Sequence, residues 1–255
     1  NGSSHPRSRI RTRMERLGRM DVVLDPKVRY SRQSLLPEIG LEGQARLASR
    51  RALVVGAGGL GAPILYYLAA AGVGHIGIVE GDVVTLSNLQ RQILYSEADL
   101  NLPKAECARS RLLALNSDCS VEIYPYYFTE ENAQSIAEGY HIIIDGCDNN
   151  HTRELMDRTA RQLGIPYLYG AVSHFVGQCS LFHYQGAGAY RDIFSTIDTE
   201  ADTEVIPVLG AMPGIIGSTM ALEAIKTLLG MGTSLAGKLL RIDALHLETQ
   251  LFEIQ

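Results

Sequence analysis

The sequence predicts an α/β fold in which a Rossmann-like parallel half, which binds nucleotide, continues into an antiparallel half within one sheet. Two observations predict it. A buried strand, a glycine-rich turn and a helix follow one another within residues 50–92, which is typical of Rossmann folds. Later segments alternate in part between apolar and polar residues, which favours antiparallel strands. A chain of 255 residues is long enough for one large domain, which we expect over residues 20–255.

Net charge and its distribution narrow the class of protein. The formal net charge is -5, yet residues 1–19 contain six arginines and one acid. We interpret this stretch as a tag or a disordered tail, because it has no apolar face, and we base no functional argument on it. The acidic remainder speaks against a nucleic-acid partner. No apolar run approaches membrane-spanning length, so we expect a soluble protein without a membrane partner.

Cysteine and histidine usage predicts a cytoplasmic protein. The chain has four cysteines with no CxxC pair, and no secretory signal. This pattern fits a reducing compartment and no disulfide framework. The seven histidines are scattered without metal-ligand spacing, so we expect no zinc site.

The first strand and its turn carry the nucleotide signature. Residues Ala52 to Val55 form an apolar, β-rich run that predicts a buried parallel strand. Gly56, Gly58 and Gly61 follow at once. Glycines at this spacing permit a tight turn and let the backbone approach a phosphate.

The next helix and strand complete this signature. A helix over about 62–71 begins at the glycine turn, so its amide groups and positive dipole end favour an anion there. The strand over 76–79 then delivers Glu80 about twenty residues after the glycines, where an acid accepts hydrogen bonds from ribose hydroxyls.

Polar side chains follow Glu80 in a segment poor in apolar residues. They are Asp82, Ser87, Asn88, Arg91 and Gln92. A dehydrogenase needs an apolar slot for nicotinamide, whereas amide and guanidinium groups suit a triphosphate and the charge that develops on it. The segment therefore predicts a triphosphate site.

Lys104 lies in the first turn of a helix predicted from Pro103 to Leu115. A cation there is unfavourable to the helix dipole. We interpret Lys104 as a phosphate ligand, and a surface lysine is the alternative.

The strand predicted over 142–145 ends in the sequence DGCDNN. Ligands of open α/β sheets bind at strand carboxyl ends, where Asp145, Asp148 and Asn149 fall. Carboxylate oxygens are ligands that Mg²⁺ prefers. The alternative is a turn with a helix N-cap, for which Asp and Asn are also favoured, and Asp148 could serve as both ligand and cap.

The remaining elements follow from periodicity and turn residues. The segment from Arg29 to Ile39 predicts a helical arm ending near Gly40 or Gly43, in which Arg32 either faces solvent or reaches phosphate in a neighbouring subunit. Further predicted helices cover 129–136, with Thr129 as cap, 152–163 and 214–229. Further predicted strands cover 121–124, 167–171, 178–184, 238–243 and 246–252. Residues 186–207 are predicted to form a functional or disordered loop.

Five sequence blocks together resemble the MoeB/ThiF/HesA family of ubiquitin-activating-like adenylyltransferases. They are RYSRQ, GAGGLG, VEGDVVTLSNLQRQ, PKAE and DGCDNN, and the resemblance runs from about Arg29 to Phe252. It implies a homodimeric enzyme that uses ATP and Mg²⁺ to adenylylate the C-terminal diglycine carboxylate of a small β-grasp, ubiquitin-like sulfur-carrier protein, with release of pyrophosphate. The carrier would serve thiamine or molybdopterin synthesis, with thiamine preferred. Sulfur would come from a separate persulfide donor.

The resemblance also implies residue roles. Gly59 lies against the phosphates and Glu80 takes the ribose hydroxyls. Asn88, Arg91 and Lys104 hold phosphates. Asp148 positions Mg²⁺ with Asn149 next to it, and Arg32 reaches the γ-phosphate of the other subunit. The catalytic set is Arg32, Arg91, Lys104 and Asp148, and the nucleotide-binding set is Gly56, Gly58, Gly59, Gly61, Glu80, Asp82, Ser87, Asn88, Leu89, Gln90, Arg91, Lys104, Asp148 and Asn149.

The chain departs from the family pattern in two places. Many relatives have a zinc-binding CxxC pair where this chain reads Ala189 to Asp192, which again predicts no zinc. A cysteine that some relatives link to the carrier aligns with Thr203, and we interpret Cys147 as a small buried residue. Alternative functions are a related enzyme adenylating another carboxylate, such as a tRNA-modifying dehydratase, an NAD-dependent oxidoreductase, and a non-catalytic partner.

Overall fold

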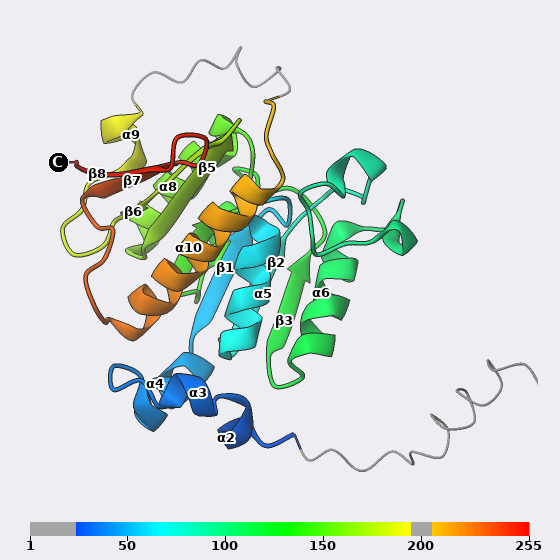
Figure 1. Ribbon diagram of the computed structural model, residues 1–255, viewed down its shortest axis with the longest axis vertical. Helices are drawn as coiled ribbons and strands as arrows, with labels where there is room; N and C mark the ends of the chain where they lie inside the picture. Colours follow the sequence, from blue (N-terminus) through cyan, green and yellow to red (C-terminus); the bar gives the residue numbers. More distant parts are fainter. Residues whose placement is uncertain (1–23, 195–205, 255) are drawn as a thin grey trace, which may run out of the picture.

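The computed structural model describes residues 24–194 and 206–254, and within them one eight-stranded sheet has the order β3-β2-β1-β4-β5-β6-β7-β8 (Figure 1). The strands are β1 (Arg51–Val55), β2 (His75–Val79), β3 (Ser120–Tyr124), β4 (Ile142–Asp145), β5 (Tyr167–Ser173), β6 (Val176–Phe182), β7 (Lys238–Asp243) and β8 (Glu248–Glu253). Strands β1 to β5 pair in parallel, whereas β5 to β8 pair antiparallel. The predicted mixed sheet is confirmed.

Helices cover both faces of the parallel half. They are α2 (Pro26–Arg29), α3 (Ser31–Ser34), α4 (Gly40–Ala48), α5 (Gly61–Ala71), α6 (Lys104–Leu115), α7 (Ala133–Ala137), α8 (Asn150–Leu163), α9 (Tyr190–Ile193) and α10 (Ala211–Leu229), with short 3-10 turns η1 (Leu86–Asn88) and η2 (Glu97–Asp99). Side chains of a strand alternate between faces, so Val54 joins the hydrophobic cluster under α5, α6 and α10, while Leu53 joins the cluster under α7 and α8. β1 is thus buried on both sides, as its apolar run predicts.

The N-terminal arm differs from the prediction. Instead of one helix that stops near Gly40 or Gly43, two short helices are followed by α4, which begins at Gly40. Gly40 has a φ of 58°, so the glycine supplies a left-handed residue that turns the chain into a new helix. The sequence pattern instead predicts that a glycine at this point ends a helix.

Several further boundaries are shifted; for example, α10 begins at Ala211 instead of 214, and β8 covers Glu248–Glu253 instead of 246–252. Thr129 does not cap a helix: its backbone N–H donates to Asn132 Oδ1 in a turn, and α7 begins after Asn132. β6 begins at Val176 and not at 178, because Ser173 pairs with Val176 across a tight turn. The pattern had placed this strand two residues late at both ends.

Within the described residues, no helix has the length and apolar character needed to cross a membrane. The predicted loop over 186–207 contains α9, which begins at Tyr190 and overlaps the range Ala189 to Asp192. The interpretations of residues 1–19 and of Thr203 lie outside the described residues.

Candidate functional site

A cleft of about 740 Å³ opens at the carboxyl ends of the central strands. It lies where β1 is flanked by β2 and β4. From here the chain leaves β1 into α5 on one face of the sheet and leaves β4 into α8 on the other. Such a switch point is where open α/β sheets bind ligands. Residues of β5 and β6 also line the cleft, so both halves of the sheet contribute to it.

The glycine turn brings two strand ends into backbone contact. Gly56 has a φ of 95°, and a Cβ there would lie 2.5 Å from the Gly146 carbonyl oxygen. A Cβ on Gly61 would lie 2.1 Å from the Gly56 oxygen, so Gly61 allows α5 to start against the turn. Gly56, Gly58 and Gly59 line the cleft, whereas Gly61 lies behind it. The turn therefore offers bare backbone to a ligand.

Glu80 directly follows β2, and its carboxylate is held in a fixed position. Its Oε2 accepts from the Ala57 N–H at 2.9 Å and its Oε1 accepts from the Asp82 N–H at 2.9 Å. The residue is only 9% exposed, yet it lines the cleft. Each carboxylate oxygen keeps a lone pair for a further donor, which suits the predicted contact with ribose hydroxyls.

Lys104 is a buried cation in the cleft wall, with 4% of its surface exposed. Its Nζ lies 3.0 Å from Asp82 Oδ2, and Tyr127 donates to Asp82 Oδ1 at 2.7 Å. Burial alone would raise the pKa of Asp82, but the hydrogen bonds from Tyr127 and Lys104 and the lysine's charge outweigh it and lower that pKa. The alternative of a surface lysine is wrong.

The residues from Ser87 to Arg91 differ in whether they line the cleft. Arg91 lines it, packs beside Gly59, and donates to the Ser87 carbonyl oxygen at 3.2 Å. The residues from Ser87 to Gln90 do not line it, and the Gln90 carbonyl packs against Gly210 at the start of α10. The predicted nucleotide contacts of Ser87, Asn88, Leu89 and Gln90 stay predictions.

The three polar residues after β4 have different surroundings. Asp145 is fully buried. Asn149 Oδ1 accepts from the Thr152 N–H at 2.9 Å and caps α8, so Asn149 and not Asp148 is the N-cap. Asp148 is exposed, lines the cleft, and has no hydrogen bond to any described side chain or backbone group. Its carboxylate is thus available to a cation.

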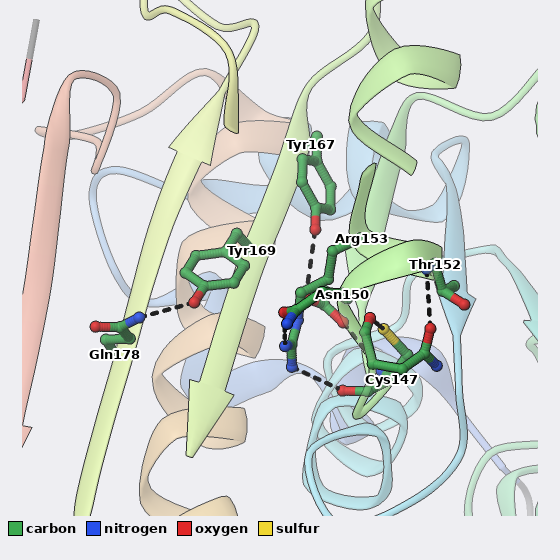
Figure 2. Close-up of polar contacts among 9 residues, drawn as sticks. Cys147, Asn150, Thr152, Arg153, Tyr167, Tyr169 and Gln178 are labelled. Carbon is green, nitrogen blue, oxygen red and sulfur yellow. Dashed lines mark hydrogen bonds and ion pairs between the residues drawn. The ribbon is translucent and has the colours of Figure 1, made fainter. Parts of the chain in front are cut away.

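Arg153 explains the burial of Asp145. Figure 2 shows its guanidinium between Tyr169 and the loop after β4. Nε lies 3.1 Å from Asp145 Oδ2, and Nη2 donates to the Cys147 carbonyl oxygen at 3.2 Å. Tyr167 donates to the same Asp145 oxygen at 3.3 Å. The ion pair between Arg153 and Asp145, together with the hydrogen bond to Cys147, therefore fixes the loop that carries Asp148.

Arg153 was missed from the sequence, although a signal existed. A strand predicted to be fully buried and to end in an acid requires a partner for that acid. An arginine eight residues further on, in the following helix, satisfies this requirement.

Cys147 has the properties of a structural residue. Burial raises the pKa of its thiol well above the usual value, and the neighbouring Asp145 charge raises it further. A protonated thiol is a poor nucleophile. By surface exposure Cys147 is half-buried, not fully buried as predicted, whereas the other three cysteines are buried, and all four are free.

Arg32 lies far from the cleft of its own chain. It is exposed on α3, at the end of the sheet opposite the cleft (Figure 1). Gln33 next to it donates to the Ala71 carbonyl oxygen at 3.0 Å, which fastens α3 to the C-terminal end of α5, a full helix length from the glycine turn. Tyr30 accepts a hydrogen bond from Asn116 at 2.7 Å, which is a second attachment of the arm.

The mixed sheet and the cleft at its switch point define a nucleotide-binding α/β protein of the Rossmann type. The chain belongs to the ThiF family, whose profile matches residues 30–255. The family resemblance drawn from the five sequence blocks is confirmed.

Curated relatives cover most of this chain. A protein of Porphyra purpurea named "Probable molybdopterin-synthase adenylyltransferase" is 45% identical over 235 residues, which is 91% of this chain and 62% of the relative. The "Sulfur carrier protein adenylyltransferase" of Thermus thermophilus is 46% identical over 86% of this chain and 83% of its own length. "Adenylyltransferase and sulfurtransferase MOCS3" of Mus musculus is 43% identical, and this chain spans 49% of it. The chain thus corresponds to only part of some relatives.

Solved structures share the fold. E. coli MccB with ATP has a TM-score of 0.79 at 20% identity, covering 89% of this chain and 71% of MccB. Selenomethionine PaaA has a TM-score of 0.74 at 22% identity, covering 92% of this chain and 85% of PaaA. At these identities the likeness concerns architecture.

Proposed function

We propose that this protein adenylylates the C-terminal diglycine carboxylate of a small ubiquitin-like sulfur-carrier protein, with ATP as the donor and pyrophosphate as the leaving group. The observation that carries the proposal is a buried lysine, Lys104, and an arginine, Arg91, in the wall of a cleft whose floor is bare glycine backbone. Membership of the ThiF family and the names of the relatives support the same reaction.

The roles of the cleft residues follow from their surroundings. Glu80 binds the ribose through the lone pairs that its two backbone hydrogen bonds leave. Gly58 and Gly59 let phosphates approach the backbone, as at other glycine turns. Arg91 and Lys104 then neutralise the phosphate charge. Asp82, which accepts a hydrogen bond from Tyr127, holds the Lys104 ammonium at the cleft wall.

The cleft fits a magnesium ion at Asp148. Its exposed carboxylate has no hydrogen bond among the described residues, and oxygen is the ligand that Mg²⁺ prefers. Asp145 does not fit this role, because its charge is matched by Arg153. A Mg²⁺ ion held by Asp148 would offset part of the phosphate charge.

The chemistry requires positioning more than proton transfer. The carrier carboxylate is ionised at neutral pH, so it needs no general base. One of its oxygens forms a bond to the α-phosphorus, and the bond from that phosphorus to the bridging oxygen of the β-phosphate breaks. Negative charge gathers on the leaving pyrophosphate, where Arg91 and Lys104 stabilise it.

The partners and setting belong to the same proposal. The carrier serves thiamine or molybdopterin synthesis, and the names of the relatives leave both pathways open. In this proposal a separate persulfide donor then supplies the sulfur. We further propose a cytoplasmic homodimer without bound zinc, in which Arg32 of each chain serves the cleft of the other.

Intact-mass spectrometry of the carrier tests the reaction. After incubation with enzyme, ATP and Mg²⁺, we expect the carrier to gain the mass of one AMP. A carrier without its two terminal glycines should remain unmodified. A truncated carrier that gains AMP equally well would contradict adenylylation at that carboxylate.

Subunit mixing tests the role of Arg32 in the partner's cleft. We expect Arg32→Ala and Lys104→Ala to be inactive alone, because each removes a phosphate contact from both clefts. Dimers assembled from one subunit of each variant should regain activity, since one cleft then contains Lys104 and the partner's Arg32. No recovery in dimers shown to be mixed would indicate that Arg32 does not act across subunits.

A further inference from the structure

Residues of β5 and β6 form a wall of the cleft that contains no charged side chain. They are Ala171, Val172, Ser173, Val176, Gly177 and Gln178. The charged residues that line the cleft, such as Glu80, Arg91 and Lys104, come from the other half of the sheet and its helices. A triphosphate is bound best by cations, so the wall of β5 and β6 suits a neutral part of a ligand.

Gln178 carries the carboxamide of this wall, and Tyr169 orients it. Gln178 Nε2 donates to the Tyr169 hydroxyl at 2.7 Å, and Figure 2 shows the amide oxygen pointing away from that contact. Tyr169 is buried, and the guanidinium carbon of Arg153 lies 5.7 Å from the centre of its ring. Arg153 therefore contacts both the loop that carries Asp148 and the ring that orients Gln178.

The neighbours of Gln178 on the sheet do not use its remaining hydrogen-bonding groups. Its Oε1 has no hydrogen bond to any described residue. Arg241 pairs with Gln178 across β6 and β7, but its guanidinium donates to Gln250 at 3.3 Å and lies 3.6 Å from Asp243. Gln178 thus retains an acceptor and a second N–H for a ligand in the cleft.

A carboxamide complements a peptide group better than it complements a phosphate. An ionised phosphate oxygen only accepts hydrogen bonds, so it would leave the acceptor Oε1 unused. A peptide group offers one N–H donor and one C=O acceptor, which match the acceptor and the donor that Gln178 retains. Of the two substrates in the proposed reaction, ATP contains no peptide group and the carrier tail does.

We propose that Gln178 binds the tail of the carrier protein, with its Oε1 accepting the N–H of a peptide group in the terminal diglycine. The inference rests on the proposed function and deepens it by naming a residue for the second substrate. Arg91 and Lys104 hold the nucleotide, and Gln178 aligns the peptide that ends in the attacking carboxylate. Tyr169 is then a positioning residue, because it acts through Gln178.

A cycle of binding measurements with enzyme and carrier variants tests the inference. Calorimetric titrations without ATP compare each intact carrier, thiamine-type or molybdopterin-type, with the same carrier lacking its terminal diglycine. We expect Gln178→Met to bind the intact carrier about three- to tenfold more weakly, which is the usual effect of one lost hydrogen bond. It should bind the truncated carrier as the wild type does, because the interacting group is already gone.

Two controls accompany the cycle. The affinity of Gln178→Met for ATP should equal that of the wild type, because Gln178 contacts no phosphate in this proposal. The variant Gln134→Met removes an exposed carboxamide from α7, outside the cleft, and should bind both carriers as the wild type does.

Two results would overturn the inference. The first is an equal affinity of Gln178→Met and the wild type for the intact carrier; if that variant still adenylylates the carrier, the proposed function stands. The second is an equal loss of affinity for the intact and truncated carriers, because it would show that Gln178 only orders the sheet around Tyr169. Diglycine binding that depends on Gln178, in a wild type that never adenylylates the carrier, would refute the proposed function and leave this inference standing. A wild type that binds neither carrier would contradict both.

Discussion

Alanine at Lys104 or at Asp148 is expected to reduce carrier-dependent pyrophosphate release by about 10²–10³-fold, with the oligomeric state unchanged. Loss of one charge-stabilising group in a preorganised site lowers rates by about 10²–10³-fold. Lys104 is buried beside Asp82 and cannot be replaced by solvent. Asp148 lies in the loop after β4, lines the cleft, and has no hydrogen bond among the described residues. Steady-state pyrophosphate release measures the reaction rate, and size-exclusion chromatography measures the oligomeric state.

Matched controls separate catalysis from folding. Asp118→Ala removes another exposed acid, from the turn after α6, and should leave the rate unchanged. Asp148→Ala should unfold at the wild-type temperature, because its side chain has no hydrogen bond among the described residues. Unimpaired turnover in either Lys104→Ala or Asp148→Ala would remove that residue from the catalytic set.

Arg153→Met is expected to lower the free energy of unfolding by about 3–5 kcal/mol, the usual effect of removing one partner from a buried ion pair. Asp145 would be left as an uncompensated charge at the end of β4. The loop that bears Asp148 would also lose the hydrogen bond from Arg153 to the Cys147 carbonyl oxygen. Denaturant unfolding measures the loss of stability. Turnover, at a temperature where the variant stays folded, measures the effect on the loop that bears Asp148.

A double variant and a pH series make this prediction specific. Asp145→Asn combined with Arg153→Met should be less destabilised than Arg153→Met alone, because the unpaired charge is gone. Burial raises the pKa of Asp145 even beside Arg153. A raised folded-state pKa favours folding as the pH falls, so the deficit of Arg153→Met should shrink towards acidic pH. The explanation by an unpaired buried charge would be contradicted if the loss of unfolding free energy in Arg153→Met were the same at every pH and equally large in the double variant.

The parallel half of the fold was predictable because its signals are local. The apolar run before Gly56, the glycine spacing and the caps of the long helices lie within a few residues of the elements they specify. β4 has the bounds that its pattern predicts, and in the antiparallel half β7 does as well. Gly40 was misread, because a glycine with positive φ either ends a helix or leads into one, and only the packing of α4 decides.

The polar network of the site depends on contacts between distant segments. Glu80 was predictable from its distance to the glycines. The pairing of Asp82 with Lys104 joins residues 22 positions apart, and that of Tyr127 with Asp82 joins residues 45 positions apart. Asp145 and Asp148 look alike in DGCDNN, yet one is buried against Arg153 and the other faces the cleft. The register of α8 against β4 decides which of the two carboxylates is paired with Arg153.

Exchange of labelled pyrophosphate into ATP, measured with separately purified thiamine-type and molybdopterin-type carriers, tests the proposed reaction most directly. We predict exchange with one intact carrier and none with the same carrier lacking its terminal diglycine. The carrier that supports exchange would also identify the pathway. Absence of exchange with both carriers, in a protein that binds ATP tightly, would contradict sulfur-carrier adenylylation and favour another carboxylate substrate or a non-catalytic role.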